Sequence, residues 1–426
     1  MQAPKDNQIE ENYCAAREIY ALWGVDTEEA LRKAAETPLS IHCWQGDDVS
    51  GLETPEEGID SGGLKATGNY PGRARNGDEL RSDLLVALKL IPGRKQRVNI
   101  HAFYAETGGR RVDRNELDVQ HFSRWLDWAA ENGIALDFNP TFFAHPLASD
   151  GYTLSSADQG VRRFWIEHGI ACRRIAAAIG KRQNEPCVNN LWIPDGEKDT
   201  PVDRWGPRRR LVESLDTILS EKLDRGHIED TLESKLFGIG SESYVVGSHE
   251  FYLSYCIRSG VHPCFDMGHF HPTESVADKI SAVLLFCEKL LLHVSRGVRW
   301  DSDHVVILSD EVQALCDEVV RGEALSRVFF ALDYFDASIN RIAAWVIGAR
   351  SFKKALLRAL LQPNALLRDL EGKGDRTARL AVLEEAKTLP FGAVWDYFCL
   401  QSGVPPQGAW VGEVKAYERE VLAKRQ

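Results

Sequence analysis

Eight short apolar runs, most of them separated by segments with helical periodicity, constrain the fold of this chain more than any other feature. They lie at 39–44, 97–103, 134–138, 188–193, a run ending at Glu233, 263–266, 290–294 and 328–333. Eight strand–helix alternations predict a closed α/β barrel of the (β/α)8 type, since a doubly wound sheet usually has fewer. The run before Glu233, His-Ile-Glu-Asp-Thr-Leu-Glu, has the weakest strand character.

The helical segments and two additions set the domain organisation. Helical periodicity covers 80–91, 119–130, 155–179, a segment that starts at Thr273, and 336 to about 361. We expect residues 1–362 to form the catalytic barrel with an N-terminal helix. Residues 363–426 keep a helical pattern outside the eightfold count, which predicts a C-terminal helical extension that contacts another subunit. The Gly-rich and charged loop 45–78 follows the first strand, so it is either a lid over the barrel mouth or a plain surface loop.

Composition limits the class of protein. A net charge of −12 and a hydrophobic fraction of 44% are ordinary for a soluble enzyme and argue against nucleic acid as the main partner. The most apolar stretch, 283–294, is too short to span a membrane and includes Glu288 and Lys289. Nine scattered cysteines without a Cys-x-x-Cys pair indicate reduced thiols and a cytoplasmic location.

Metal-ligand residue types follow one another at the ends of the second-half runs. They are Glu233, Asp266, His269, His293, Asp301, Asp303 and Asp333. In a parallel barrel the carboxyl ends of the strands meet at one mouth, so these side chains are expected to converge. Seven ligands suit two neighbouring sites with Asp266 as a shared bridge. Oxygen ligands favour Mg²⁺ or Mn²⁺, and the added imidazoles tilt the preference toward Mn²⁺, Co²⁺ or Zn²⁺.

Other residues near strand ends complete the predicted site. Lys235 would place a positive charge beside a polarised oxygen. His101, Trp44, Trp192 and Phe335 are candidates for the wall of a sugar pocket, although ordinary core packing explains such residues equally well. The segment from Gly238 lacks the Gly-Lys-Ser/Thr of a phosphate loop, and Gly247-Ser-His lacks the spacing of a serine nucleophile elbow.

At these residues the chain resembles the L-rhamnose isomerase family along nearly its whole length. The segments that carry the resemblance are Ser-Ile-His-Cys-Trp-Gln-Gly-Asp-Asp-Val (40–49), Ala-Thr-Gly-Asn-Tyr-Pro-Gly (66–72), Asn-Leu-Trp-Ile-Pro-Asp-Gly (190–196), Gly-His-Phe-His-Pro-Thr (268–273), His-Val-Ser-Arg (293–296), Val-Arg-Trp-Asp-Ser-Asp-His (298–304) and Asp-Ala-Ser-Ile-Asn-Arg-Ile-Ala-Ala-Trp (336–345). The order Glu-x-Lys, Asp-x-x-His, Asp-x-Asp and Asp, typical of sugar-isomerase barrels, is also present.

The resemblance implies a (β/α)8 barrel, usually a homotetramer, that interconverts L-rhamnose and L-rhamnulose with Mn²⁺ as the first step of rhamnose catabolism. It implies a 1,2-hydride shift between C2 and C1 of the open-chain sugar. One metal would be held by Glu233, Asp266, His293 and Asp333. A second would be held by Asp266, His269, Asp301 and Asp303 and would carry the catalytic water. His269, Asp301, Asp303, Lys235 and Asp333 are the expected catalytic residues.

Other functions remain open from the residues alone. A metal-dependent isomerase or epimerase of another deoxy or rare sugar fits the same ligands. A metal-dependent hydrolase acting on a phosphodiester is disfavoured by the acidic balance. A metal-independent epimerase, or a sugar-binding barrel without catalysis, would not need this many ligand residues.

Overall fold

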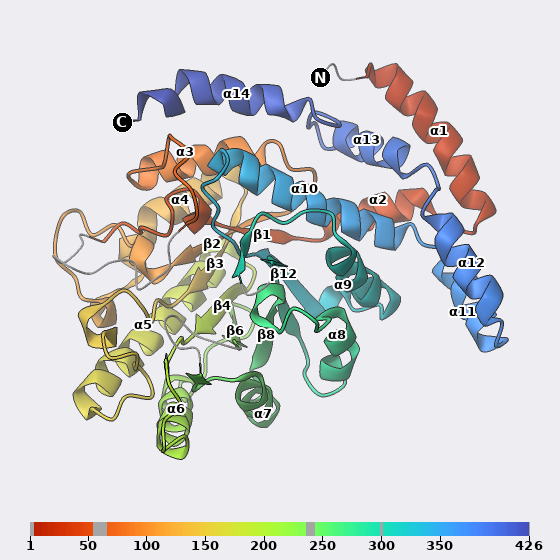
Figure 1. The fold of residues 1–426 in the computed structure, drawn as a ribbon. Helices are drawn as coiled ribbons and strands as arrows, with labels where there is room; N and C mark the ends of the chain where they lie inside the picture. Colours follow the sequence, from red (N-terminus) through yellow and green to blue (C-terminus); the bar gives the residue numbers. More distant parts are fainter. Residues whose placement is uncertain (1–3, 54–65, 236–242, 299–300, 426) are drawn as a thin grey trace.

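The fold is an eight-stranded parallel barrel. The computed structural model describes residues 4–53, 66–235, 243–298 and 301–425, with the side chains of 301–303 outside the description. Within these residues the closed barrel consists of β1 (Leu39–His42), β2 (Gln96–His101), β3 (Ala135–Asn139), β4 (Cys187–Trp192), β6 (Ile228–Glu233), β8 (His262–Asp266), β9 (Leu290–Val294) and β12 (Val328–Leu332), in that order around the ring (Figure 1). The predicted (β/α)8 class and all eight predicted strands are confirmed.

Helices surround the barrel and continue beyond it. The eight helices that follow the strands are α3 (Gly77–Leu88), α4 (Ser123–Asn132), α5 (Gln159–Gln183), α6 (Trp205–Ile218), α7 (His249–Ser259), α8 (Ala277–Leu284), α9 (Asp310–Arg321) and α10 (Arg341–Leu360). The chain begins with α1 (Asp6–Leu22) and α2 (Thr27–Glu36) and ends with α11 (Asn364–Gly372), α12 (Arg376–Ala386), α13 (Phe391–Gln401) and α14 (Trp410–Glu420). Two small antiparallel pairs decorate the mouth: β5 (Gly196–Glu197) with β7 (Tyr244–Val245), and β10 (Arg296–Val298) with β11 (Asp301–His304).

Four helices start later than the sequence predicts: α4 at Ser123 rather than 119, α5 at Gln159 rather than 155, α8, and α10, where local hydrogen bonds compete with the helix. The segment from Asp336 is not helical: the Asp336 carbonyl oxygen accepts from the side chain of Gln45, and the Ala337 carbonyl oxygen accepts from the backbone N–H of Tyr70. Helix α10 begins only after Asn340, whose side-chain oxygen accepts from two backbone N–H groups of the first turn. Likewise α8 begins at Ala277 rather than at Thr273.

The barrel closes where the first strand meets the last. Strand β1 pairs with β12 through Ser40 and Ala331. His42 Nε2 contacts the carbonyl oxygen of Tyr334. The indole N–H of Trp345 donates to the His42 carbonyl at 2.8 Å, and the ammonium of the buried Lys353 donates to the carbonyl of Thr37 at 2.6 Å. These contacts, together called the seam below, join residues about 300 positions apart in the chain.

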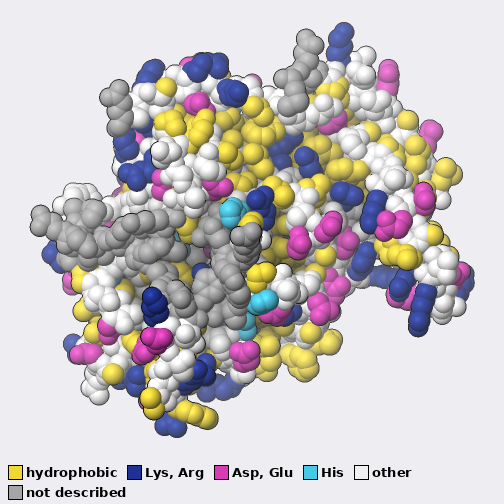
Figure 2. All heavy atoms as spheres, viewed as in Figure 1, with side chains coloured by type: hydrophobic (Ala, Val, Ile, Leu, Met, Phe, Trp, Pro, Cys, Tyr) yellow, Lys and Arg dark blue, Asp and Glu magenta, His cyan; other side chains and the backbone are white. Residues whose placement is uncertain are grey.

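The C-terminal helices lie along one side of the barrel and return to its first helix (Figure 1). Arg425 forms a bidentate pair with Asp83 of α3 at 2.6 and 2.8 Å, and Tyr417 donates to the same carboxylate. Tyr13 of α1 stacks on Tyr397 of α13 with ring centroids 3.8 Å apart. On the face seen in Figure 2, Lys and Arg side chains are interspersed with Asp and Glu over these helices. The predicted helical extension is confirmed as a structural element.

Two further features concern the cysteines and the helices. All nine cysteines are free thiols, and only Cys14 is exposed. In the part of the chain that the structure describes, every helix is too short or too polar to cross a lipid bilayer.

Candidate metal centre

Four predicted ligands meet at the barrel mouth because their strands end there in register. Glu233 ends β6, Asp266 ends β8, His293 lies in β9, and Asp333 directly follows β12. The parallel pairing sets Asp266 beside His293. One ligand atom from each of the four residues lies within 4.8 Å of the other three. The structure therefore brings together the set that the sequence predicted for one metal.

The ion pairs that these carboxylates make among the described residues are with imidazoles. Nδ1 of His293 lies 3.3 Å from an oxygen of Asp333, 3.5 Å from Glu233 and 3.7 Å from Asp266, so one imidazole faces three carboxylates. Burial disfavours a charged imidazole, yet the surrounding anionic groups raise the pKa of His293 well above its usual value. A divalent cation placed among these oxygens would offset the excess negative charge.

Neighbouring side chains fix the orientation of each carboxylate. Asn190 of β4 donates to Glu233 at 2.6 Å. Ser295 donates to Asp266 at 2.5 Å, and the indole N–H of Trp44 donates to Asp333 at 3.0 Å. The sequence reasoning missed Asn190 and Ser295 as parts of the site. Each lies two positions from a residue that was singled out, Trp192 and His293, and so points to the same face of the barrel.

His269 lies next to this cluster, in a single 3-10 turn (Met267–His269) after β8. Its Nδ1 is 3.0 Å from Glu233 Oε1 and 3.2 Å from the carbonyl oxygen of Ser234, and its Nε2 is 4.0 Å from Asp266. Asp301 and Asp303 belong to β11 in the hairpin above the mouth, but their side chains lie outside the described residues. The second predicted ligand set is therefore placed only through His269 and Asp266.

A cavity adjoins the carboxylates and holds all the predicted pocket residues. Its walls are Trp44, Val49, His101, Phe143, Trp192, Lys235 and Phe335, with Glu233, Asp266, His269 and Asp333 at one side. Lys235 Nζ lies 5.1 Å from the centre of the Trp192 ring. Burial lowers the pKa of His101 to about 3, so its imidazole is neutral near pH 7. The aromatic walls and a few polar groups match the make-up of a small sugar site.

The loop after β1 enters the cavity through an unusual turn. Asp48 and Val49 both have left-handed backbone angles, with φ of 58° and 60°, a conformation that is costly for a β-branched residue. Arg341, at the start of α10, binds the Asp48 carboxylate through two 2.7 Å hydrogen bonds and so holds the turn. The sequence reasoning missed Val49 and Phe143. The centre of the predicted lid, residues 54–65, lies outside the described residues.

Comparison with known proteins identifies the family. Residues 7–425 match the family model described as L-rhamnose isomerase (RhaA). The chain is 56% identical to an L-rhamnose isomerase of Rhodopirellula baltica, covering 98% of this chain and 97% of that one, and 56% identical to one of Escherichia coli, covering 98% and 99%. The chain belongs to the L-rhamnose isomerase family. Members of the L-rhamnose isomerase family are aldose–ketose isomerases, so the predicted family and enzyme class are confirmed.

Solved structures with a similar barrel are more distant. An L-ribulose 3-epimerase aligns with a TM-score of 0.47 at 12% identity, covering 75% of this chain and 95% of its own. A D-allulose 3-epimerase from Methylomonas sp. aligns with a TM-score of 0.46 at 11% identity, covering 77% and 98%.

Proposed function

We propose that this protein interconverts L-rhamnose and L-rhamnulose, with a divalent cation at the barrel mouth. The observation that carries the proposal is the convergence of Glu233, Asp266, His293 and Asp333 beside an aromatic-walled cavity, in a chain of the L-rhamnose isomerase family. The relatives named L-rhamnose isomerase match almost end to end, which supports the same substrate here.

The donor set fits a bound metal ion. Both ring nitrogens of His293 are buried, and neither has a hydrogen-bond partner among the described residues. Such an imidazole beside three carboxylates is typical of a metal ligand. The first ion would be held by Glu233, Asp266, His293 and Asp333, and a second by Asp266, His269, Asp301 and Asp303. We propose Mn²⁺, which accepts this mixture of oxygen and imidazole ligands.

The chain's own residues position the sugar for the reaction. When bound, the metal ions would polarise the sugar carbonyl and lower the pKa of a hydroxyl group or water beside it. Lys235, on the cavity wall, would stabilise negative charge that develops on the carbonyl oxygen. Trp44, Trp192 and Phe335 present apolar faces to the carbon chain and exclude water, which favours transfer of a hydride between C2 and C1 over exchange with solvent.

Metal removal tests the proposal directly. The protein is stripped with a chelator, and L-rhamnulose formation from L-rhamnose is measured before and after Mn²⁺ is restored. We expect activity to disappear on stripping and to return with Mn²⁺. Full activity in the metal-free protein would overturn the metal proposal, whereas activity on another deoxy or rare sugar alone would overturn the substrate.

Assembly stays a prediction. The homotetramer expected from the family resemblance is supported only by exposed apolar side chains, such as Leu285 and Phe286, which are 80% and 73% exposed in the single chain. Sedimentation of the purified protein would test it.

A further inference from the structure

Cys264 lies directly beneath the predicted metal ligands. It is on β8, two residues before Asp266 and therefore on the same face of the strand, and it pairs in register with Glu233 of β6. It is fully buried in a small apolar layer with Val188, Leu291 and Ala331. The simplest function of such a thiol is to fill space in the barrel interior. Its immediate neighbours indicate a second function.

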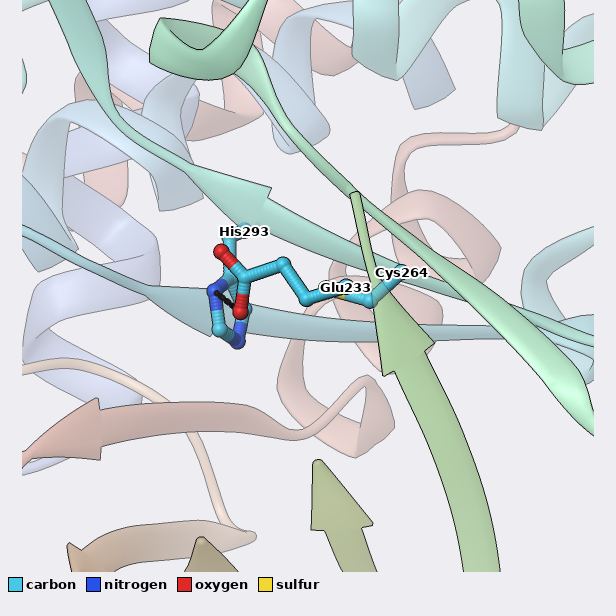
Figure 3. Close-up of side chains that lie close together, drawn as sticks. All are labelled: Glu233, Cys264 and His293. Atoms are coloured by element: carbon cyan, nitrogen blue, oxygen red, sulfur yellow. Dashed lines mark ion pairs between the residues drawn. The ribbon is translucent and has the colours of Figure 1, made fainter. Parts of the chain in front are cut away.

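The thiol is close to two residues that already serve the mouth. One ligand atom each of Glu233, Cys264 and His293 lies within 4.8 Å of the others. Figure 3 shows these side chains together, with the Glu233 carboxylate against the His293 imidazole. The orphaned, buried ring nitrogens of His293 are a separate observation that points to a ligand here. Nδ1 of the same ring lies 3.3–3.7 Å from oxygens of Asp333, Glu233 and Asp266, so this imidazole serves both sets of ligands.

We propose that Glu233, Cys264 and His293 form an alternative, sulfur-containing site that takes soft or borderline ions such as Cd²⁺ and Zn²⁺. Carboxylate-rich sets favour hard ions, whereas a thiolate adds strong preference for soft ones. Because Glu233 and His293 belong to both sets, an ion in the sulfur-containing site excludes an ion from the carboxylate site. The identity of the metal would thus decide which of the two adjacent sets is used.

The chemistry balances without a further reactant. The Cys264 thiol loses its proton to solvent as the sulfur–metal bond forms, and the protonated His293 ring loses one as the nitrogen–metal bond forms, so two protons are released for each ion bound. Burial raises the pKa of this thiol, and the ion must supply the free energy of deprotonation. Metal–ligand bonds of about 2.0–2.3 Å in a tetrahedron require ligand atoms about 3.3–3.8 Å apart. Glu233 and His293 already lie 3.5 Å apart, so the remaining closure toward Cys264 is at most about 1–1.5 Å.

The decisive experiment uses Cd²⁺ with the metal-stripped, full-length protein in a Cys14→Ser background, because Cys14 is the exposed thiol. Cadmium–thiolate coordination gives an ultraviolet charge-transfer band that carboxylate coordination lacks. We expect about one equivalent of the band in this background and in the control Cys316→Ala, whose thiol is equally buried in α9. The band should vanish in Cys264→Ala. No band in the background protein, or a band that persists in Cys264→Ala, would overturn the proposal.

A second measurement does not depend on the Cys264 variant folding. The ¹¹³Cd resonance of the background protein reports its ligands, and a shift typical of one sulfur ligand supports the proposal. A shift typical of oxygen and nitrogen alone contradicts it.

A third experiment measures competition between Cd²⁺ and Mn²⁺ and rests on the proposed function, because its readout is isomerisation. Cd²⁺ should inhibit Mn²⁺-supported isomerisation, and half-inhibition, measured relative to each variant's own Mn²⁺ rate, should need at least tenfold more Cd²⁺ in Cys264→Ala. Unchanged half-inhibition would contradict the proposal. If no isomerisation occurs with Mn²⁺ alone, the proposed function fails, while the spectroscopic arms still decide the Cys264 site.

Discussion

The two ends of strand β6 carry one glutamate each, Glu229 near the barrel floor and Glu233 at the mouth. Both are buried, with 4% and 2% exposure. Glu229 is paired with Lys289 and with His262, whose Nε2 is 3.0 Å away. The ion pairs that Glu233 makes among the described residues are with imidazoles, which it shares with other carboxylates.

The same difference holds for the two ends of the barrel. At the floor, Arg97 binds Asp137 through hydrogen bonds of 2.7 and 3.0 Å and also reaches Glu185. At the mouth, three carboxylates surround His293. The carboxylates at the floor are thus neutralised by Lys and Arg side chains of the chain itself. The mouth has an excess of negative charge, which a cation from solution can offset. The two glutamates are equally buried but have different roles. Glu229 stabilises the floor of the barrel, whereas Glu233 belongs to the site at the mouth.

The largest effect is expected from Glu233→Gln. Loss of a carboxylate ligand should lower Mn²⁺ affinity and turnover by more than about 100-fold, since even removal of an outer partner of a ligand costs about 10–100-fold. Isothermal titration with Mn²⁺ and the rhamnose assay measure both quantities.

Glu229→Gln is the matched control for this variant. It should bind Mn²⁺ nearly normally but unfold more easily, because breaking a buried ion pair costs about 3–5 kcal/mol. If both variants lose Mn²⁺ affinity equally, the contrast between the two ends is wrong.

A smaller effect is expected at the residues that orient the ligands. Ser295→Ala removes the 2.5 Å hydrogen bond to Asp266 and should weaken Mn²⁺ binding by about 10–100-fold. Ser40→Ala is the control, because Ser40 is a buried serine of the barrel whose Oγ has no hydrogen-bond partner in the described residues. Identical Mn²⁺ affinities in the two variants would show that Ser295 does not position Asp266.

The ion pairs of Glu229 with His262 and Lys289 should make the free energy of unfolding depend on pH. Burial alone would raise the pKa of Glu229, but hydrogen bonds from His262 and Lys289 outweigh it and lower this pKa to about 2. Between the unfolded value of about 4.5 and about 2, the unfolded chain binds more protons than the folded one, so stability is lost as the pH falls through this window. The difference in denaturant midpoint between wild type and Glu229→Gln should therefore shrink from pH 6 to pH 3. A constant difference would contradict the assignment.

The smallest effect is expected at the Arg341–Asp48 ion pair, which lies at the mouth and whose two charges balance each other. Arg341→Met frees Asp48 and relaxes the left-handed turn that sets Val49 against the cavity. Release of about 1 kcal/mol of enforced backbone strain should raise the KM for L-rhamnose by about 3–10-fold. Mn²⁺ affinity should stay unchanged, as expected of a pair that is already balanced. Arg368→Met, which breaks the exposed pair with Glu323, is the control. A loss of Mn²⁺ affinity would place Arg341 in the metal centre instead.

The strand count and the polar residues at strand ends sufficed to predict the barrel and four converging ligands. In a parallel barrel, register alone brings such residues to one mouth. Even the weak strand ending at Glu233 formed, because its internal acids find partners: Asp230 binds Arg173 and Glu229 binds Lys289. Those partners are far away in sequence, so local propensity undervalued this strand.

The residues that were missed depend on long-range contacts. Val49 lines the cavity, and the aspartate before it is bound by Arg341, almost 300 residues later. No local pattern marks two consecutive left-handed residues that include a valine. Helix α10 starts later than predicted because the carbonyl oxygens of Asp336 and Ala337 accept from Gln45 and Tyr70 instead of from a following helical turn. Asn190 and Ser295 carried a signal in their alternation with Trp192 and His293, which the sequence reasoning did not use.

The seam has a consequence for how the protein is made. Trp44, beside β1, reaches Asp333, beside β12, across this junction, so part of the metal centre spans it. During synthesis nearly 300 residues are added after β1 before its second neighbour, β12, is made. Contacts of such high sequence separation form slowly. We therefore expect the site to be complete only once the ring has closed. A nascent or partly unfolded chain that has not closed lacks a complete ligand set, which ties metal capture to the final step of folding.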